Sequence, residues 1–243
     1  MRKAYADDLA YIHDVGFCDF VLNAVPGLLA MLRRRGIRSG LVVDVGCGSG
    51  IWARRLCDEG YDVWGIDISP AMIRLARRKA PPGRFVIGSF LRSDLPPCSA
   101  ITALGEVLNY AFDRQNGLRG LGRFFQRAYN ALKPGGLLIF DIAEPGRGGP
   151  GGVRQGGSAG KDWAILFRIR ENKDQLTRHI VTFRKSGKGY RRSEETHVLR
   201  LYPSTLIASM LRKNGFKVEI LAGYGRTKFP LGLKGFVAVK GRV

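Results

Sequence analysis

The segment between residues 41 and 143 alternates short apolar runs with stretches of helical spacing. Each apolar run is nearly continuous, which is typical of strands in a parallel sheet buried on both faces. The stretches between them place apolar residues on one side of a helix, as packing on such a sheet requires. The pattern therefore predicts an α/β fold with helices on both faces of a mostly parallel sheet. The predicted strands are 41–45, 61–67, 84–89, 99–105 and 135–143, and the predicted helices are 49–59, 70–79 and 117–132.

The segments on either side of this core have different patterns. The first 37 residues have helical spacing with breaks near Gly16 and Pro26. The segment 144–162 is rich in glycine, which predicts a flexible connection. After it the period changes to two, which predicts three antiparallel strands, followed by one helix and two closing strands. The expected parts of this single domain, 1–243, are a helical cover (1–37), a core (41–143), a hinge (144–162), an antiparallel β insertion (163–202) and the closing elements (203–243).

The chain is strongly basic, with 40 Lys and Arg against 20 Asp and Glu and a formal net charge of +20. The excess is uneven, because residues 146–243 hold 21 basic and only 6 acidic side chains. Charge of this size bears on partners and not on fold. Its position suggests an anionic ligand that approaches from the insertion side, although base composition alone is an alternative. On this hypothesis, neutralising Arg191 and Arg192 would weaken the use of that ligand.

Several features bear on the compartment. The most apolar stretch, 20–32, is too short to span a membrane and contains Asn23 and Pro26. The opening MRKAYADD places acids where a signal peptide needs its apolar region. The four cysteines lack the spacing of metal ligands and are expected to be reduced; they are Cys18, Cys47, Cys57 and Cys98. We therefore expect a cytoplasmic protein with neither a membrane segment nor a bound metal.

A glycine-rich turn follows the first predicted strand in the string VVDVGCGSG, residues 42–50. Such a turn lets a ligand approach the backbone and points free N–H groups at it. A dinucleotide site would need a third glycine where Ile51 stands. Asp67 ends the second predicted strand, where a carboxylate accepts hydrogen bonds from both hydroxyls of a ribose. These features together predict an adenosine site; the alternative is that Asp67 only caps the following helix.

These residues resemble a known family. Asp44-x-Gly46-x-Gly48-x-Gly50 is similar to the first motif of class I S-adenosylmethionine-dependent methyltransferases, GIDIS with Pro70 and Met72 to the second, and LKPGGLLIF to their fifth strand. The resemblance implies a Rossmann-like seven-stranded sheet of order 3-2-1-4-5-7-6, with the last strand antiparallel. It also implies S-adenosylmethionine as the cofactor. By this similarity the cofactor-binding residues would be Asp44, Gly46, Cys47, Gly48, Asp67, Ile68, Met72, Ser89, Phe90, Gly105 and Glu106.

The end of the fourth predicted strand, GEVLNYAF, lies where ligands bind in such sheets. It lacks the Asn/Asp-Pro-Pro-aromatic motif of base-modifying amino methyltransferases and looks like the small-molecule type. Glu106 would contact the cofactor or the acceptor and is a candidate catalytic residue. Asn109 and Tyr110 would line the acceptor pocket; the alternative is that they cap and pack the next helix.

His13 is the first candidate for a catalytic base or acceptor contact, since it lies in the helical segment that covers the crevice in related enzymes. His179 and His197 fall in alternating strands and are expected to be exposed or packed. Aromatic residues that would wall the acceptor pocket are Tyr5, Tyr11 and Trp163, with Tyr224 as a further candidate.

Three functions remain open from the sequence. The first is transfer of a methyl group by in-line displacement to nitrogen or oxygen of a small, anionic acceptor. The second is methylation of nucleic acid, above all RNA, with the basic C-terminal face holding the backbone. The third is a binding module that senses S-adenosylmethionine without turnover. A homodimer through the antiparallel insertion is a further expectation.

Overall fold

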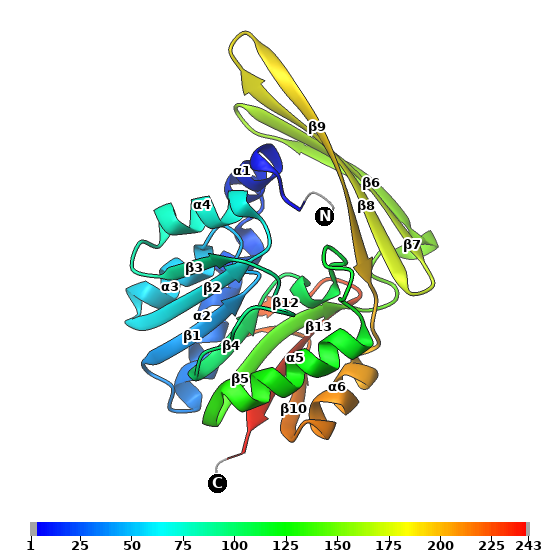
Figure 1. Ribbon diagram of the computed structural model, residues 1–243. Coiled ribbons are helices and arrows are strands. Elements are labelled where there is room, and N and C mark those ends of the chain that lie inside the picture. The colour runs from blue at the N-terminus through cyan, green and yellow to red at the C-terminus, as the bar shows by residue number, and fades with distance from the viewer. Residues whose placement is uncertain (1–3, 242–243) are drawn as a thin grey trace.

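A computed structural model of the protein describes residues 4–241 and places a seven-stranded sheet at its centre (Figure 1). The strand order is β3-β2-β1-β4-β5-β13-β10, and β13 runs antiparallel to both of its neighbours. This confirms the predicted order 3-2-1-4-5-7-6. The strands are β1 Gly40–Val45, β2 Tyr61–Asp67, β3 Arg84–Ile87, β4 Cys98–Ala103, β5 Leu132–Ala143, β10 Phe216–Leu221 and β13 Leu233–Lys240.

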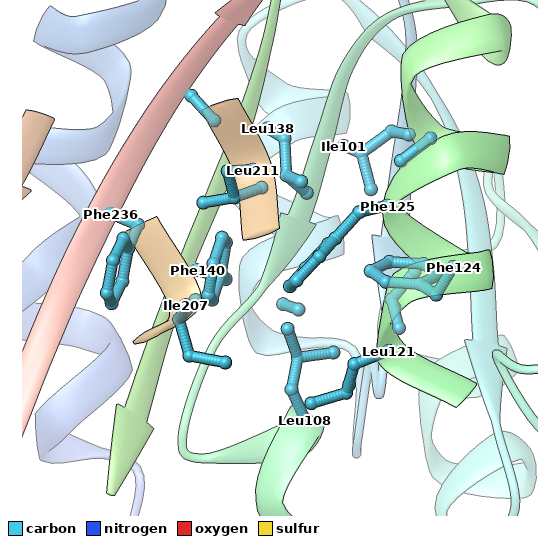
Figure 2. Close-up of a cluster of buried hydrophobic side chains, with 14 of the residues drawn as sticks. Ile101, Leu108, Leu121, Phe124, Phe125, Leu138, Phe140, Ile207, Leu211 and Phe236 are labelled. Atoms are coloured by element: carbon cyan, nitrogen blue, oxygen red, sulfur yellow. The ribbon is translucent and has the colours of Figure 1, made fainter. Parts of the chain in front are cut away.

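Helices cover both faces of the sheet, as the near-continuous apolar strands require. Successive residues of β5 alternate between two cores: Leu138 packs toward α5 and α6, and Leu137 packs toward α2, α3 and α4. Figure 2 shows the first core, where Phe125 of α5 lies between Phe140 of the sheet and Phe124 of the same helix. The helices are α1 Asp7–Gly16, α2 Asp19–Arg34, α3 Ile51–Asp58, α4 Pro70–Lys79, α5 Leu118–Ala131 and α6 Ser204–Lys213.

The N-terminal helices break at Gly16, as predicted, but not at Pro26. Pro26 lies inside α2, whose buried residues Ala24, Leu28, Leu29 and Leu32 pack in the core and hold the helix together across the missing N–H group. Of the helices in residues 4–241, none is alone long and apolar enough to cross a membrane. The pair α1–α2 reaches that length and composition, but it bends by 60° at its break.

A second sheet stands apart from the first (Figure 1) and has four antiparallel strands instead of the three expected. We call it the cover sheet. Its order is β6-β7-β8-β9, and hairpin turns join β7 to β8 and β8 to β9. Its strands are β6 Val153–Ala159, β7 Trp163–Asn172, β8 Gln175–Ser186 and β9 Gly189–Arg200. The smaller elements are η1 Val107–Asn109, η2 Pro150–Gly152, β11 Gly223–Tyr224 and β12 Thr227–Lys228. The first of the two predicted closing strands is divided, because β10 ends at Leu221 and β11 is a separate short strand.

The fourth strand comes from the glycine-rich segment 144–162, which was expected to be a flexible hinge. Its second half pairs with β7 along the whole of β6, because glycine does not prevent backbone hydrogen bonding. Its first half is a loop in which the N–H groups of Gly146 and Gly148 both donate to the carboxylate of Glu171, at 2.5 Å each. Glycine suits this loop because Gly146, Gly149, Gly151 and Gly152 have positive φ. The segment is therefore ordered around a carboxylate that comes from β7.

The cover sheet is attached to the rest of the protein through α1. Leu9 and Ile12 of α1 pack against Trp163, Ile165 and Ile180 on one face of the cover sheet. A second cluster joins β5 to the far end of the same face through Ala143, Ile169, Leu176, Leu199 and Leu201. The cover sheet therefore lies above the carboxyl ends of the central strands, with its apolar face turned toward them.

Candidate active site

A cavity of about 450 Å³ lies between the carboxyl ends of the central strands and the cover sheet. Its floor is formed by the loops after β1, β2, β3 and β4, and its roof by α1 and the inward face of β7 and β8. The structure brings most of the predicted cofactor residues together on this wall. Those that line it are Gly46, Gly48, Asp67, Ile68, Met72, Ser89, Phe90, Gly105 and Glu106.

The glycine-rich turn is fixed by close packing at its first glycine. Gly46 has φ +64°, and a Cβ atom there would lie 2.5 Å from the side chain of Val107. Only glycine fits this position. The turn is tied to β2 by two hydrogen bonds, from Cys47 N to Ile66 O at 3.0 Å and from Gly48 N to the Asp67 carboxylate at 2.9 Å. A ligand in the cavity therefore meets a rigid stretch of backbone.

Asp67 is held at the end of β2 by two backbone amides. One carboxylate oxygen accepts from Gly48 N and the other accepts from Ser69 N at 2.8 Å. Burial raises the pKa of Asp67 to about 6, against the opposing effect of these hydrogen bonds. The helix cap of α4 is Ser69, whose hydroxyl accepts from Met72 N, so the alternative interpretation of Asp67 as a cap is wrong. Each carboxylate oxygen keeps a further lone pair with which a ribose hydroxyl can bond.

Two predicted cofactor residues stand behind the glycine turn instead of facing the cavity. Asp44 is buried and accepts a hydrogen bond from the Thr102 hydroxyl at 2.8 Å, and Trp52 Nε1 donates to that hydroxyl at 3.2 Å. Burial raises the pKa of Asp44 to about 7. The thiol of Cys47 is buried as well. Neither residue lines the cavity, and both side chains are buried beneath the turn.

Glu106 lines the cavity between two arginines. Arg147 donates to one of its carboxylate oxygens through Nε, and Arg178 of β8 donates to the other through Nη2, each at 2.5 Å. Burial opposes ionisation of Glu106, but the two guanidinium groups outweigh it and hold its pKa below the usual range. A carboxylate held in this way is a poor proton acceptor, so Glu106, predicted as a candidate catalytic residue, is not suited to act as a base.

A residue that the sequence analysis missed sets the backbone at Glu106. Asp141 on β5 is buried and accepts from the N–H groups of Gly105 and Glu106 and from the hydroxyl of Tyr224. Gly105 and Glu106 both have positive φ, and for Glu106 this is an uncommon conformation. The only sequence signal for Asp141 was its position near the end of a buried strand, next to Ile142. Tyr224 thus supports the site from behind and does not wall it.

One part of the cavity wall combines side chains from three separate segments. The hydroxyls of Tyr5 and Tyr110 are 3.0 Å apart, and Arg178 Nη1 donates to the Tyr110 hydroxyl at 2.9 Å. The His13 ring meets the Tyr5 ring edge-on at 5.2 Å between centroids. Phe112, which was not predicted, stacks on Tyr110 at 4.9 Å. Tyr5, His13 and Tyr110 therefore lie together on one cavity wall, and their role toward an acceptor stays a prediction.

Three other predicted wall residues have structural roles. Asn109 is buried, and its amide bonds to the backbone of Ala143 in β5 and Arg200 in β9, so it neither lines the cavity nor caps the next helix. The Tyr11 hydroxyl donates to Asp162, and the Arg184 guanidinium lies over its ring. Trp163 packs in the cluster between α1 and the cover sheet. None of the three lines the cavity, because each is taken up in joining two elements.

The basic residues chosen for the anionic ligand are also different from those at the cavity. Arg191 donates to Asp8 of α1, and Arg192 pairs with Glu194 on the outer side; neither lines the cavity. His179 is exposed, and His197 is fully buried against Glu195 at 2.9 Å, as expected for strand residues. The basic residues on the cavity wall are Arg147, Arg154 and Arg178. Arg178 shares the inward alternation of Leu176 and Ile180, a signal that could have identified it.

His13 should make stability depend on pH. Burial lowers its pKa to about 4 from the usual 6.5 of histidine, and its Nδ1 atom is buried without a hydrogen-bond partner among residues 4–241. The unfolded chain thus binds the proton first, so this contribution to the free energy of unfolding is complete above pH 6.5 and is lost as pH falls toward 4. We expect wild type to lose about 2 kcal/mol relative to His13→Gln between pH 7 and pH 4.5.

Urea unfolding of the two proteins at several pH values measures this difference. The matched control is His179→Gln on the exposed face of the cover sheet. Parallel pH profiles for wild type and His13→Gln would contradict the buried position of the imidazole.

The comparisons with known proteins agree with this geometry. Residues 42–136, which include the glycine turn and Asp67, match the family model described as a methyltransferase domain. This match, together with solved structures of S-adenosylmethionine-dependent methyltransferases that share the fold, supports a class I S-adenosylmethionine-dependent methyltransferase. It is an enzyme, and S-adenosylmethionine is its cofactor. Within residues 4–241 no group of three or more His, Cys, Asp or Glu side chains is arranged to hold a metal ion.

Two curated relatives and one solved structure align with most of this chain. A putative methyltransferase YqeM of Bacillus subtilis is 25% identical over 74% of this chain and 74% of its own length. The dTDP-3-amino-3,6-dideoxy-α-D-glucopyranose N,N-dimethyltransferase of Streptomyces fradiae is 26% identical over 81% of this chain and 77% of its own. The structure of the sugar N-methyltransferase KedS8 from Streptoalloteichus sp. superposes with a TM-score of 0.76 at 22% identity, over 100% of this chain and 98% of that one.

Proposed function

We propose that this methyltransferase methylates nitrogen in a small-molecule amine. The observation that carries the proposal is the enclosure of the acceptor end, where Tyr5, His13, Tyr110 and Phe112 wall the same cavity that the cofactor residues line. The cover sheet roofs this end through Ile165, Phe167 and Ile180, which suits a small acceptor. Two relatives named above are sugar N-methyltransferases, and this supports the proposal.

The protonation states on the cavity wall favour an amine over an alcohol. S-adenosylmethionine supplies a methyl group that is already activated, so the protein mainly has to orient the acceptor and exclude water. A hydroxyl acceptor needs a base at the site, whereas an amine only needs to arrive deprotonated. The pKa of Glu106 is lowered by two arginines and that of His13 is lowered to about 4 by burial, so both are weak bases. In our proposal His13 accepts or donates a hydrogen bond and orients the amine.

The proposal is tested by incubating the enzyme with isotopically labelled S-adenosylmethionine and two fractions of a cell extract, one of small molecules and one of RNA. We expect label in the small-molecule fraction, with the methyl group located on nitrogen by tandem mass spectrometry. Asp67→Asn is the control for turnover at this site. Label found only in RNA, and released by ribonuclease, would contradict the proposal and favour the nucleic-acid alternative. Label on oxygen would contradict the choice of an amine.

Oligomeric state stays a prediction. The expected homodimer through the insertion would use the cover sheet, whose outermost strand β6 has exposed side chains in contrast to the buried face of β7. Sedimentation of the purified protein measures it.

A further inference from the structure

The cavity is electrostatically uneven. Its cofactor end carries Asp67, and Asp113 on its wall pairs with Arg92, while its cover end carries the three arginines Arg147, Arg154 and Arg178 around the carboxylate of Glu106. Both terminal nitrogens of Arg178 already have partners, since they donate to Glu106 and Tyr110. The cover end therefore holds more positive charge than its own side chains neutralise.

The two remaining arginines keep donors free. Arg147 reaches Glu106 through Nε, which leaves the two terminal nitrogens of its guanidinium without a protein partner within residues 4–241. Arg154 forms no ion pair with any of the described residues 4–241. Its guanidinium lies 6.0 Å from the centre of the Phe167 ring. Because arginine carries five N–H donors in a planar fork, both side chains can take an oxyanion with two oxygens facing each guanidinium.

The backbone aims both arginines at the same place. Arg147 sits between Gly146 and Gly148, whose N–H groups are fixed on the Glu171 carboxylate. In the cover sheet, Arg154 of β6 pairs with Ile169 of β7, and Ile169 pairs with Arg178 of β8. The side chains of Arg154, Ile169 and Arg178 therefore form one row across the inward face of this sheet. The carboxylate of Glu171 thus holds the loop of the glycine-rich segment in place, and Arg147 and Arg154 of this segment both line the cavity.

We propose that Arg147 and Arg154 form a subsite for a phosphate group of the acceptor. The inference rests on the proposed function, because it places the acceptor in this cavity, and it adds that the amine acceptor is phosphorylated. A phosphate ester carries more charge than a carboxylate and has enough oxygens to engage both guanidinium forks. Glu106 then acts as the counter-ion that holds Arg147 in position while the site is empty.

Calorimetric titration of the enzyme saturated with S-adenosylhomocysteine tests the subsite. The probes are inorganic phosphate, glucose 1-phosphate and thymidine diphosphate, which separate a free phosphate, a sugar phosphate and a nucleoside diphosphate. We expect at least one ester to bind more tightly than inorganic phosphate, and its affinity to fall as salt rises. Arg154→Gln and Arg147→Gln should each weaken that binding by at least about 10-fold, since each removes a charge-assisted hydrogen bond.

Matched controls separate this inference from the function on which it rests. Arg168→Gln changes an exposed arginine on the opposite face of the cover sheet and should leave probe binding unchanged. Arg154→Gln breaks no ion pair, so it tests the subsite even if Arg147→Gln unfolds. Binding of no probe, or equal binding by wild type and Arg154→Gln, would overturn the subsite. If S-adenosylhomocysteine binding weakens as much as probe binding, the arginines hold the cofactor instead, and the subsite is again overturned. A methylated amine without phosphate would overturn the subsite while leaving the proposed function intact.

Discussion

Asp67→Asn is expected to weaken the binding of S-adenosylmethionine by about 10- to 100-fold, since a hydrogen bond to a charged group is worth about 1.5–3 kcal/mol. The carboxylate accepts from Gly48 N and Ser69 N and also lines the cavity, where we expect it to bind the ribose. Asparagine offers one acceptor oxygen where the carboxylate offers two, so it cannot do both. Isothermal titration calorimetry with S-adenosylhomocysteine measures the change.

The pH dependence of the same titration gives a second sign of the carboxylate. Burial raises the pKa of Asp67 to about 6, so the empty site loses its charge as pH falls below that value. Wild-type affinity should therefore decrease from pH 7 to pH 5, and the affinity of Asp67→Asn should change much less. Asp62→Asn, on an exposed position of the same strand, is the matched control and should bind as wild type does. Unchanged affinity in Asp67→Asn would contradict the adenosine site.

Glu106→Gln should lower the free energy of unfolding by about 3–5 kcal/mol, the usual cost of removing one partner from a buried ion pair. The side chains of Arg147 and Arg178 are only 14% and 17% exposed, and Glu106 is the carboxylate that both of them contact. A neutral amide leaves two partly buried cations close to each other. Urea unfolding at pH 7, followed by circular dichroism, measures the loss.

The stability difference between wild type and Glu106→Gln should also depend on pH. Because the pKa of Glu106 is lower in the folded protein, its stabilisation is present above its unfolded pKa and is lost as pH falls through the folded value. The difference between wild type and Glu106→Gln should therefore shrink in acid. Glu59→Gln removes an exposed partner of Arg33 and should cost no more than about 1 kcal/mol. Equal effects of the two substitutions would show that Glu106 is not buried between the arginines.

The central sheet and its cofactor side could be predicted because local sequence determines them. The strand order follows from apolar runs and a known resemblance, and Gly46 is required by a turn that admits no Cβ atom. Asp67 was found for the same reason, since the end of a parallel strand places its residue at the ligand-binding edge.

The acceptor side could be predicted only in part, because it is assembled from segments far apart in the sequence. Whether Trp163 or Phe167 faces the cavity depends on the contacts that each strand of the cover sheet makes with α1, and these are long-range. Asn109 has the composition of a pocket residue, but the backbone of Ala143 and Arg200 takes its amide. Arg147 lies in a stretch that reads as a flexible hinge, and only the approach of Glu171 gives it a fixed position.

The most direct test of the active-site assignment is a crystal structure of the complex with S-adenosylhomocysteine. We expect the ribose hydroxyls within hydrogen-bond distance of the Asp67 carboxylate and the amino-acid part of the ligand along Gly46 and Gly48. The sulfur atom should face the wall formed by Tyr5, His13 and Tyr110. Density for the ligand at another place, or a sulfur atom turned away from that wall, would contradict it.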